Sequence, residues 1–172
     1  MNDKIDIGKK LFDIFSNNWN EIFLFDGTEN RKITYQEFFT YILKFKEKLE
    51  ILGLKKNDTV CFLVSNSLEL VILYFASLFL GLKIIPVDVE KGTDEIQEIL
   101  SLSNFDLLIY EDIQINSNKL LVSINEFKII STDLVDISKI ESFKKINFDG
   151  VFLITFTSGS TGTPKGVIHS FR

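Results

Sequence analysis

The chain has 172 residues, of which 45% are hydrophobic and 25% charged, so its length and composition allow one domain with its own hydrophobic core. Its net charge of −5 argues against a nucleic-acid-binding surface, and its single cysteine excludes a disulfide framework and a cysteine-based metal cluster. The opening sequence MNDKIDIGKK carries charges where a secretory signal needs an apolar run, so we expect a cytoplasmic protein.

Stretches of helical and strand-like hydrophobic spacing follow one another along the chain, separated by turn-forming residues. They predict a helix near 11–17, strands at 22–25 and 31–34, a helix over 34–52, a strand at 60–64, a helix ending at Gly81, a strand at 83–87, a helix over 94–102, a strand at 106–110, weak strands at 120–123 and 127–130, and strands at 151–156 and from Val167. Strand and helix alternate from residue 34 to residue 110, which indicates an α/β fold with a mainly parallel sheet and helices on both faces.

Capping and length signals support several of these elements. Thr34 followed three residues later by Glu37 matches a capping box, and Thr93 is the expected cap of the helix over 94–102. The uncharged run from Leu70 to Leu82 is too short to span a bilayer and predicts a buried helix.

The stretch 157–166 reads TSGSTGTPKG and combines three glycines, five hydroxyl side chains and one lysine. Glycines let backbone amides approach an anion, hydroxyls add hydrogen-bond donors, and Lys165 supplies the positive charge that phosphate oxygens attract. A flexible linker has a similar composition, but the apolar strand 151–156 before this stretch is untypical of a linker. The Walker-type phosphate loop is excluded, because Pro164 stands where its second glycine is needed. We therefore interpret 157–166 as a cradle for the outer phosphates of ATP.

The sequence TSGSTGTPKGV resembles, nearly letter for letter, the phosphate-binding signature of the adenylate-forming superfamily. That group includes acyl-CoA synthetases, adenylation domains of non-ribosomal peptide synthetases, D-alanine–carrier ligases and luciferases. The segments ITYQE, LKKNDTV and FLGLKIIPVD are also similar to the start of such enzymes, so the resemblance covers residues 30–172. The chain departs from the family pattern at three positions that leave its subfamily open: Asn57 replaces a usual glycine, Val89 a common proline and Phe171 a frequent histidine.

The resemblance implies an enzyme that joins a carboxylic acid to the α-phosphate of ATP, releases pyrophosphate and passes the acyl group to a thiol. ATP with Mg²⁺ would be the cofactors, and coenzyme A or the phosphopantetheine of a carrier protein would accept the acyl group. The implied binding residues are Thr157, Ser158, Gly159, Ser160, Thr161, Gly162, Thr163, Lys165 and Gly166. Side-chain contacts are expected from Ser158, Ser160, Thr161 and Lys165, and backbone contacts from the three glycines.

The resemblance further implies that 1–172 is the N-terminal portion of an adenylation domain, without the remainder of the large domain and without the small C-terminal domain. In such enzymes the parts that recognise adenine, ribose and the acyl group come later in the chain. We therefore expect no catalytic residue within the fragment, and we expect isolated 1–172 to be inactive.

An acyl-CoA-synthetase-like ligase is the leading hypothesis, and an adenylation domain that feeds a carrier protein is the alternative within the same class. A non-catalytic nucleotide-binding remnant is an alternative from another class. A peripheral membrane protein is a further one, and it requires the helix over 70–82 to face outward. The expected ligands are ATP and a carboxylic acid, without nucleic acid and without a membrane span.

Single reactive side chains outside the loop are expected to be structural. Cys61 lies within an apolar strand and is expected to be a buried, unreactive thiol. His169 is the only histidine and stands at the start of a strand, where a structural role is the more common one. Asp88 and Glu90 follow a strand, where acids are common in loops, so we assign no metal site to them.

Overall fold

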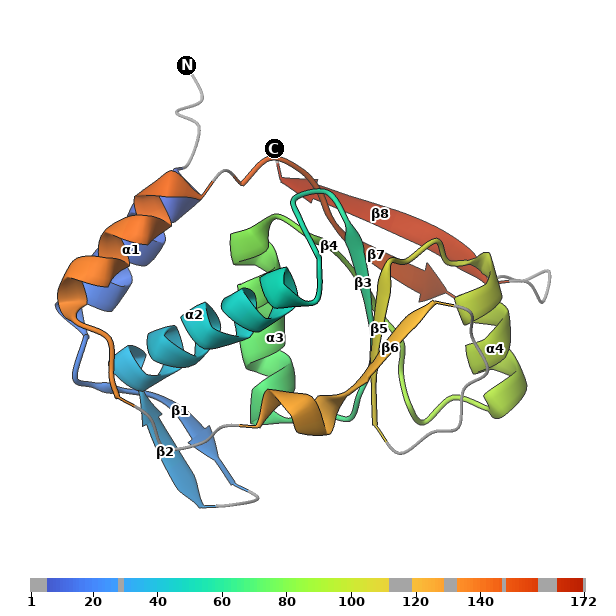
Figure 1. The fold of residues 1–172 in the computed structure, drawn as a ribbon, viewed down its shortest axis with the longest axis horizontal. Coiled ribbons are helices and arrows are strands. Elements are labelled where there is room, and N and C mark those ends of the chain that lie inside the picture. The colour runs from blue at the N-terminus through green and yellow to red at the C-terminus, as the bar shows by residue number, and fades with distance from the viewer. Residues whose placement is uncertain are drawn as a thin grey trace.

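A mixed sheet runs through the middle of the protein, and within the described residues its strands are β3 Thr59–Leu63, β4 Lys83–Pro86, β5 Leu107–Tyr110, β6 Leu120–Ser123, β7 Gly150–Thr157 and β8 Lys165–Phe171. The computed structural model describes residues 6–27, 30–111, 119–128, 133–146, 148–157 and 164–171. The strands lie in the order β6-β5-β3-β4-β7-β8 (Figure 1). All neighbours pair in parallel except β7 and β8, which are antiparallel. The predicted α/β fold with a mainly parallel sheet is confirmed.

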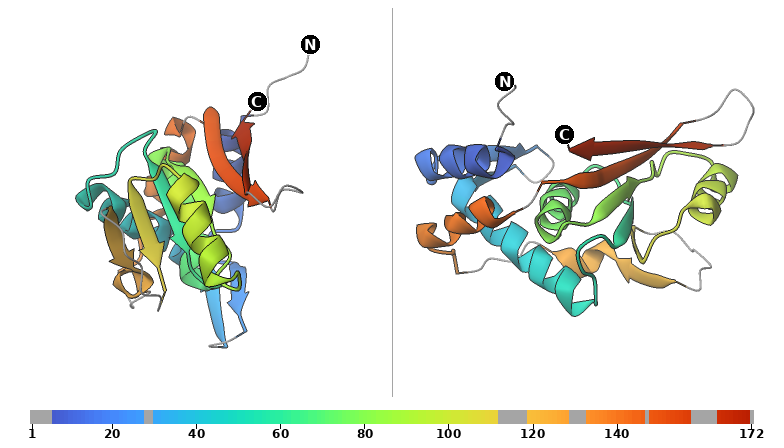
Figure 2. Two further views of the ribbon diagram at one scale, coloured as in Figure 1. Left: turned by 90° about the vertical axis from the view of Figure 1, so that its right-hand side faces the viewer. Right: turned by 90° about the horizontal axis from the view of Figure 1, so that it is seen from above.

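Helices cover both faces of this sheet, and the described α-helices are α1 Ile7–Asn17, α2 Tyr35–Ile51, α3 Leu68–Leu80 and α4 Thr93–Leu102. Figures 1 and 2 show α2 and α3 on one side of the sheet and α4 on the other. Successive residues of β3 point to opposite faces, so Val60 and Phe62 join the core with α2 and α3, whereas Cys61 packs with α4. Every residue of β3 is therefore buried, as its continuous apolar run predicts.

Local capping sets the ends of the two central helices. The backbone N–H of Glu37 donates to Thr34 Oγ1 at 3.2 Å, and the Glu37 carboxylate accepts from the Thr34 N–H at 2.7 Å. These two bonds confirm the predicted capping box at the start of α2. α3 begins after its N-cap Ser67 and ends at Gly81, whose φ of 76° lies in the left-handed region that favours glycine.

The apolar helix α3 is part of the core. Ile72, Leu73 and Ala76 are completely shielded from solvent between α2 and the sheet. The hypothesis of a peripheral membrane protein requires this helix to face outward, so the burial of these residues contradicts it. In the part of the chain that the structure describes, no helix combines the length and the apolar character needed to cross a membrane.

Two local predictions are wrong. Thr93 is not the cap of α4 but its first helical residue, because Gly92 occupies the N-cap position and no side chain caps the helix. The predicted strand at 127–130 fails at its start, because Phe127 ends a short 3₁₀ helix, and positions 129 and 130 lie outside the described residues. The Phe127 ring is buried against Phe45, with centroids 5.3 Å apart, so tertiary packing overrides the strand propensity of this segment.

The N-terminal elements pack against the larger core. The two predicted strands are present as β1 Ile22–Asp26 and β2 Arg31–Thr34, and the structure pairs them as a separate antiparallel sheet. α1 packs against the 3₁₀ helix Ile137–Lys145, with the rings of Phe15 and Phe143 4.8 Å apart. Gly8 permits this approach, because a Cβ there would lie 2.6 Å from the Phe143 carbonyl oxygen.

Candidate functional site

The predicted phosphate loop joins the carboxyl end of β7 to the start of β8. β7 contains the predicted apolar strand 151–156, and β8 begins at Lys165, slightly before the predicted Val167. Thr157 pairs with Lys165 across this hairpin, and Thr157 Oγ1 donates to the Lys165 carbonyl oxygen at 3.5 Å. Both residues are exposed, so the Lys165 ammonium group is accessible to an anion at the base of the loop.

The structure describes three of the predicted binding residues, Thr157, Lys165 and Gly166. The others lie outside the described residues: Ser158, Gly159, Ser160, Thr161, Gly162 and Thr163. At Gly166 an added Cβ would lie 3.6 Å from Cγ2 of Ile154, an ordinary contact, so no described neighbour requires glycine there. The structure thus brings the two ends of the loop together, and the contacts expected of its other residues stay predictions.

A recess of about 490 Å³ lies at the carboxyl ends of β3, β4 and β7, beside this hairpin. The chain leaves β3 toward α3 and leaves β4 toward α4 on the opposite face, so the two connections diverge at this edge. Open α/β sheets commonly bind ligands where neighbouring connections diverge in this way. The polar and charged residues that line it include Ser65, Asn66, Asp88, Glu90, Lys91 and Thr155.

Internal contacts already hold several charged groups of the recess. The Asp88 carboxylate accepts from the Glu90 backbone N–H at 2.9 Å, and Lys91 forms an ion pair with Glu95 on α4. Among the described residues, no three His, Cys, Asp or Glu side chains are grouped closely enough to hold a metal ion. The recess therefore offers hydrogen-bonding and apolar surface next to the loop, and its described residues form no metal cage.

A cysteine, a tyrosine and a histidine lie in or near the recess, and the structure shows the surroundings of each. Burial raises the pKa of the Cys61 thiol to about 12, which confirms the prediction of a buried, unreactive cysteine. Burial also raises the pKa of Tyr74, which lines the recess. His169 is exposed on β8, where its Nε2 lies 3.0 Å from Thr155 Oγ1, so it links the two strands of the hairpin.

Sequence reasoning misses the recess because its residues come from strands that become neighbours only in the folded sheet. Ser65 and Asn66 come shortly after β3, and polar residues after a buried strand are a local signal that points to this edge. Thr155 gives no such signal, since it lies inside the apolar strand β7.

Comparisons with known proteins identify the family to which this sequence is similar. A model of the family described as "AMP-binding enzyme" matches residues 15–172. The 2-succinylbenzoate–CoA ligase of Bacillus licheniformis is 28% identical over 142 residues, which are 83% of this chain and 30% of the ligase. The chain therefore spans less than a third of that relative.

Solved structures of similar fold include NpsA-ThdA of Klebsiella oxytoca, an artificially fused adenylation–PCP di-domain. It has a TM-score of 0.75 and 26% identity over 95% of this chain and 32% of its own. The O-succinylbenzoate coenzyme A synthetase of Bacillus subtilis, solved with ATP and magnesium ion, has a TM-score of 0.74 and 21% identity, over 94% of this chain and 42% of its own. Because the family match covers nearly the whole sequence and the fold agrees, this chain belongs to the AMP-binding enzyme family.

Proposed function

We propose that this chain provides the pyrophosphate-holding part of an ATP-dependent ligase, which activates a carboxylic acid as an acyl-adenylate and transfers the acyl group to a thiol. The carboxylate attacks the α-phosphate of ATP, and the bond to pyrophosphate breaks. Backbone N–H groups and hydroxyls of the loop, together with Lys165, stabilise the charge that develops on this leaving group. The observation that carries the proposal is the TSGSTGTPKG loop at the carboxyl end of β7, with the exposed Lys165 at its base.

ATP and Mg²⁺ are the proposed cofactors. The family's description and the related synthetase solved with ATP and magnesium support this choice. A loop of glycines, hydroxyls and one lysine suits phosphate oxygens, whereas the described residues offer no acidic cluster for a bare metal ion. Mg²⁺ would therefore arrive bound to the ATP phosphates and neutralise part of their charge.

The proposed acceptor is the thiol of coenzyme A, because the curated relative is named as a CoA ligase. The phosphopantetheine of a carrier protein is the second candidate, supported by the likeness to the adenylation–PCP di-domain. Both acceptors and ATP are available in the cytoplasm, which is the compartment we propose.

Binding of Mg²⁺-pyrophosphate to the purified chain, measured by titration calorimetry, tests the role of Lys165. Lys165→Ala should weaken this binding by about tenfold or more, because hydrogen bonds to charged groups contribute roughly 1.5–3 kcal/mol. Lys55→Ala is the matched control, since Lys55 is also exposed but precedes β3, at the opposite end of the sheet. Equal affinities of the Lys165→Ala variant and the unchanged chain would contradict the proposal.

A further inference from the structure

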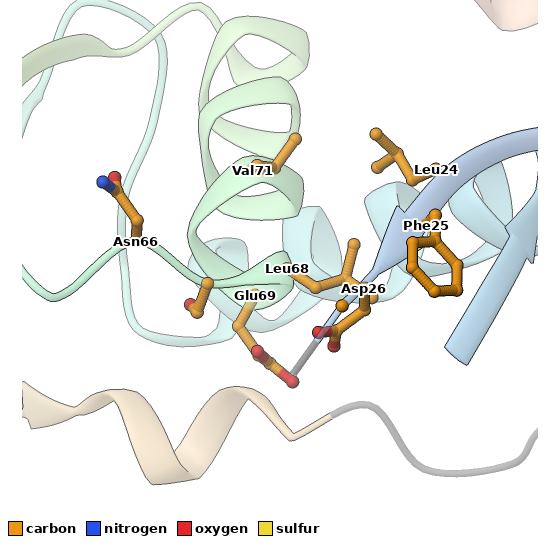
Figure 3. A pocket seen from close by; sticks show the side chains of 9 residues that line it. Leu24, Phe25, Asp26, Asn66, Leu68, Glu69 and Val71 are labelled. Atoms are coloured by element: carbon orange, nitrogen blue, oxygen red, sulfur yellow. The ribbon is translucent and has the colours of Figure 1, made fainter. Parts of the chain in front are cut away.

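Two hollows in the described part of the protein differ in the charge of their lining. The hollow between β1 and α3, about 390 Å³ in volume, is lined by the acids Asp26 and Glu69, and no lysine or arginine is among its described lining residues (Figure 3). A smaller hollow of about 170 Å³ lies between α2 and the 3₁₀ helix Ile124–Phe127. Three lysines and one glutamate line the smaller hollow, although the whole chain has a net charge of −5. Positive charge is therefore concentrated at this place.

One of the three lysines is engaged within the protein, and two are not. The Lys48 ammonium group lies 3.1 Å from the Glu126 carboxylate, and it also donates to the Glu126 carbonyl oxygen. Lys44 and Lys128 are exposed, and the ammonium group of neither forms an ion pair or a hydrogen bond with another described residue. The hollow thus presents two cations to an anion from solution.

Tyr41 of α2 adds a hydrogen-bond donor to the same lining. The residue is only 7% exposed, yet its hydroxyl forms no hydrogen bond with another described residue. Buried polar groups are normally hydrogen-bonded, so an unpaired donor beside two cations marks a place for a ligand. Burial and the charge of Glu37 raise the pKa of the Tyr41 hydroxyl, while Arg31 acts in the opposite direction. The hydroxyl therefore keeps its proton at neutral pH and can donate it to an anion.

We propose that this hollow binds a phosphate group, held by the ammonium groups of Lys44 and Lys128 and by the Tyr41 hydroxyl. Two cations match the charge of a phosphate group, which approaches −2 at neutral pH. The volume of about 170 Å³ lies below the range of about 300–1,000 Å³ that is typical of pockets for larger ligands, so the hollow suits the phosphate group alone.

The acids near the hollow are themselves held by other groups. Lys48 pairs with Glu126, and the Glu37 carboxylate accepts from the backbone N–H and the hydroxyl of Thr34. The described lining includes no residue of β7 or β8, so the site is separate from the loop at 157–166. This inference is therefore independent of the proposed function.

Inorganic phosphate is the probe, titrated into the isotope-labelled whole chain and followed through its backbone amide signals by NMR. All titrations use Lys165→Ala as the background, so that binding at the proposed phosphate loop does not contribute. We expect saturable shifts of the amides at 41–48 and 126–128, and sodium chloride at equal ionic strength should not cause them. Methyl phosphate distinguishes two sources of the ligand: equal affinity assigns the phosphate ester of a larger molecule, and loss of binding assigns the free ion.

Variants of the lining residues test each contact. Tyr41→Phe keeps the ring and removes a hydroxyl without an internal hydrogen bond, so the urea midpoint should stay unchanged while phosphate binding weakens about tenfold. Lys44→Ala and Lys128→Ala should each weaken binding about two- to fivefold, as expected for exposed ion pairs. Lys139→Ala is the matched control, because Lys139 is an exposed lysine on the 3₁₀ helix Ile137–Lys145.

Four results would each overturn the proposal. They are shifts that do not saturate, equal shifts with chloride, an affinity that Tyr41→Phe leaves unchanged, and a lower urea midpoint of Tyr41→Phe. The last result would show that the hydroxyl serves the fold and not a ligand.

Discussion

Cys61 lies in the middle of β3 with none of its surface exposed, and this burial makes its thiol a pH-sensitive contribution to stability. Burial raises its pKa from about 9 in the unfolded chain to about 12 in the folded chain. Below pH 9 the thiol keeps its proton in both states, so it does not lower the free energy of unfolding. Above pH 9 only the unfolded state ionises, so the free energy of unfolding should fall by about 2 kcal/mol between pH 9 and about pH 10.5.

Urea unfolding at a series of pH values measures this effect, with Cys61→Ala as the comparison. The variant loses packing at every pH, but its stability should depend less steeply on pH above 9. Burial also raises the pKa values of Tyr41 and Tyr74, and both tyrosines remain in the variant. The charge of the Cys61 thiolate contributes to the raised pKa of Tyr74, so the difference between the two slopes reports the thiol together with its effect on Tyr74. Parallel curves for the two proteins would contradict the assigned cause.

At the scale of elements, a threonine stands at the start of both α2 and α4, but only the threonine of α2 caps its helix. Replacement by alanine should therefore affect the stability of the protein differently at the two sites. Thr34→Ala removes a side chain that accepts from the Glu37 N–H, so the free energy of unfolding should fall by about 1 kcal/mol. Thr93→Ala on α4 removes no capping bond and should change it by less than about 0.5 kcal/mol. Urea midpoints give both values, and a larger cost for Thr93→Ala would refute this capping assignment.

Much of the secondary structure follows from local signals in the sequence, whereas the order of the strands does not. The capping box at Thr34 and the glycine stop at Gly81 are short-range patterns, and both appear in the fold. The pairing of Val60 with Leu107 joins strands that are not consecutive in the chain, and hydrophobic periodicity carries no information about such partners. The predicted strand at Phe127 is wrong for the same reason, because the conformation there depends on packing against Phe45, which is distant in the sequence.

Only part of the candidate site can be predicted from the sequence: the loop can, and the recess cannot. Lys165 and the loop are found from sequence because glycine, hydroxyl and cation stand together in one continuous stretch. The recess beside them is assembled from Asn66, Asp88 and Thr155, which follow or belong to three different strands. Only the folded sheet brings their strand ends to one edge, so no spacing rule reveals them.

For the whole molecule, we expect purified 1–172 to catalyse no acid-dependent exchange between ATP and pyrophosphate. The described residues supply the two ends of the proposed phosphate loop and a neighbouring recess, while the chain spans 30% of the related CoA ligase. Exchange of radioactive pyrophosphate into ATP, with and without a panel of carboxylic acids, measures this activity. Pyrophosphate binding in the calorimetric test provides the control that the protein is folded, and exchange above the background of Lys165→Ala would disprove the expectation.

The exposed edge of the large sheet predicts how the purified chain behaves at high concentration. β8 forms this edge, and its Ile168 is 65% exposed and its Val167 43% exposed. The rings of Phe152 and Phe171 stack on the same hairpin with centroids 4.2 Å apart. Lys165 at the start of β8 is the one lysine, arginine, aspartate or glutamate of this strand, so none of these charged residues stands in its middle to oppose pairing with another copy.

We therefore expect the chain to self-associate through β8, and we expect Ile168→Lys to shift this association to severalfold higher protein concentration. A lysine at this position places a charge directly on the strand that must pair, at little cost to the core because Ile168 is mostly exposed. Sedimentation velocity over a range of concentrations gives the distribution of species. Ile51→Lys is the matched control, since Ile51 is 78% exposed at the end of α2, away from any strand edge. If both variants associate as the unchanged chain does, the contact lies on another surface.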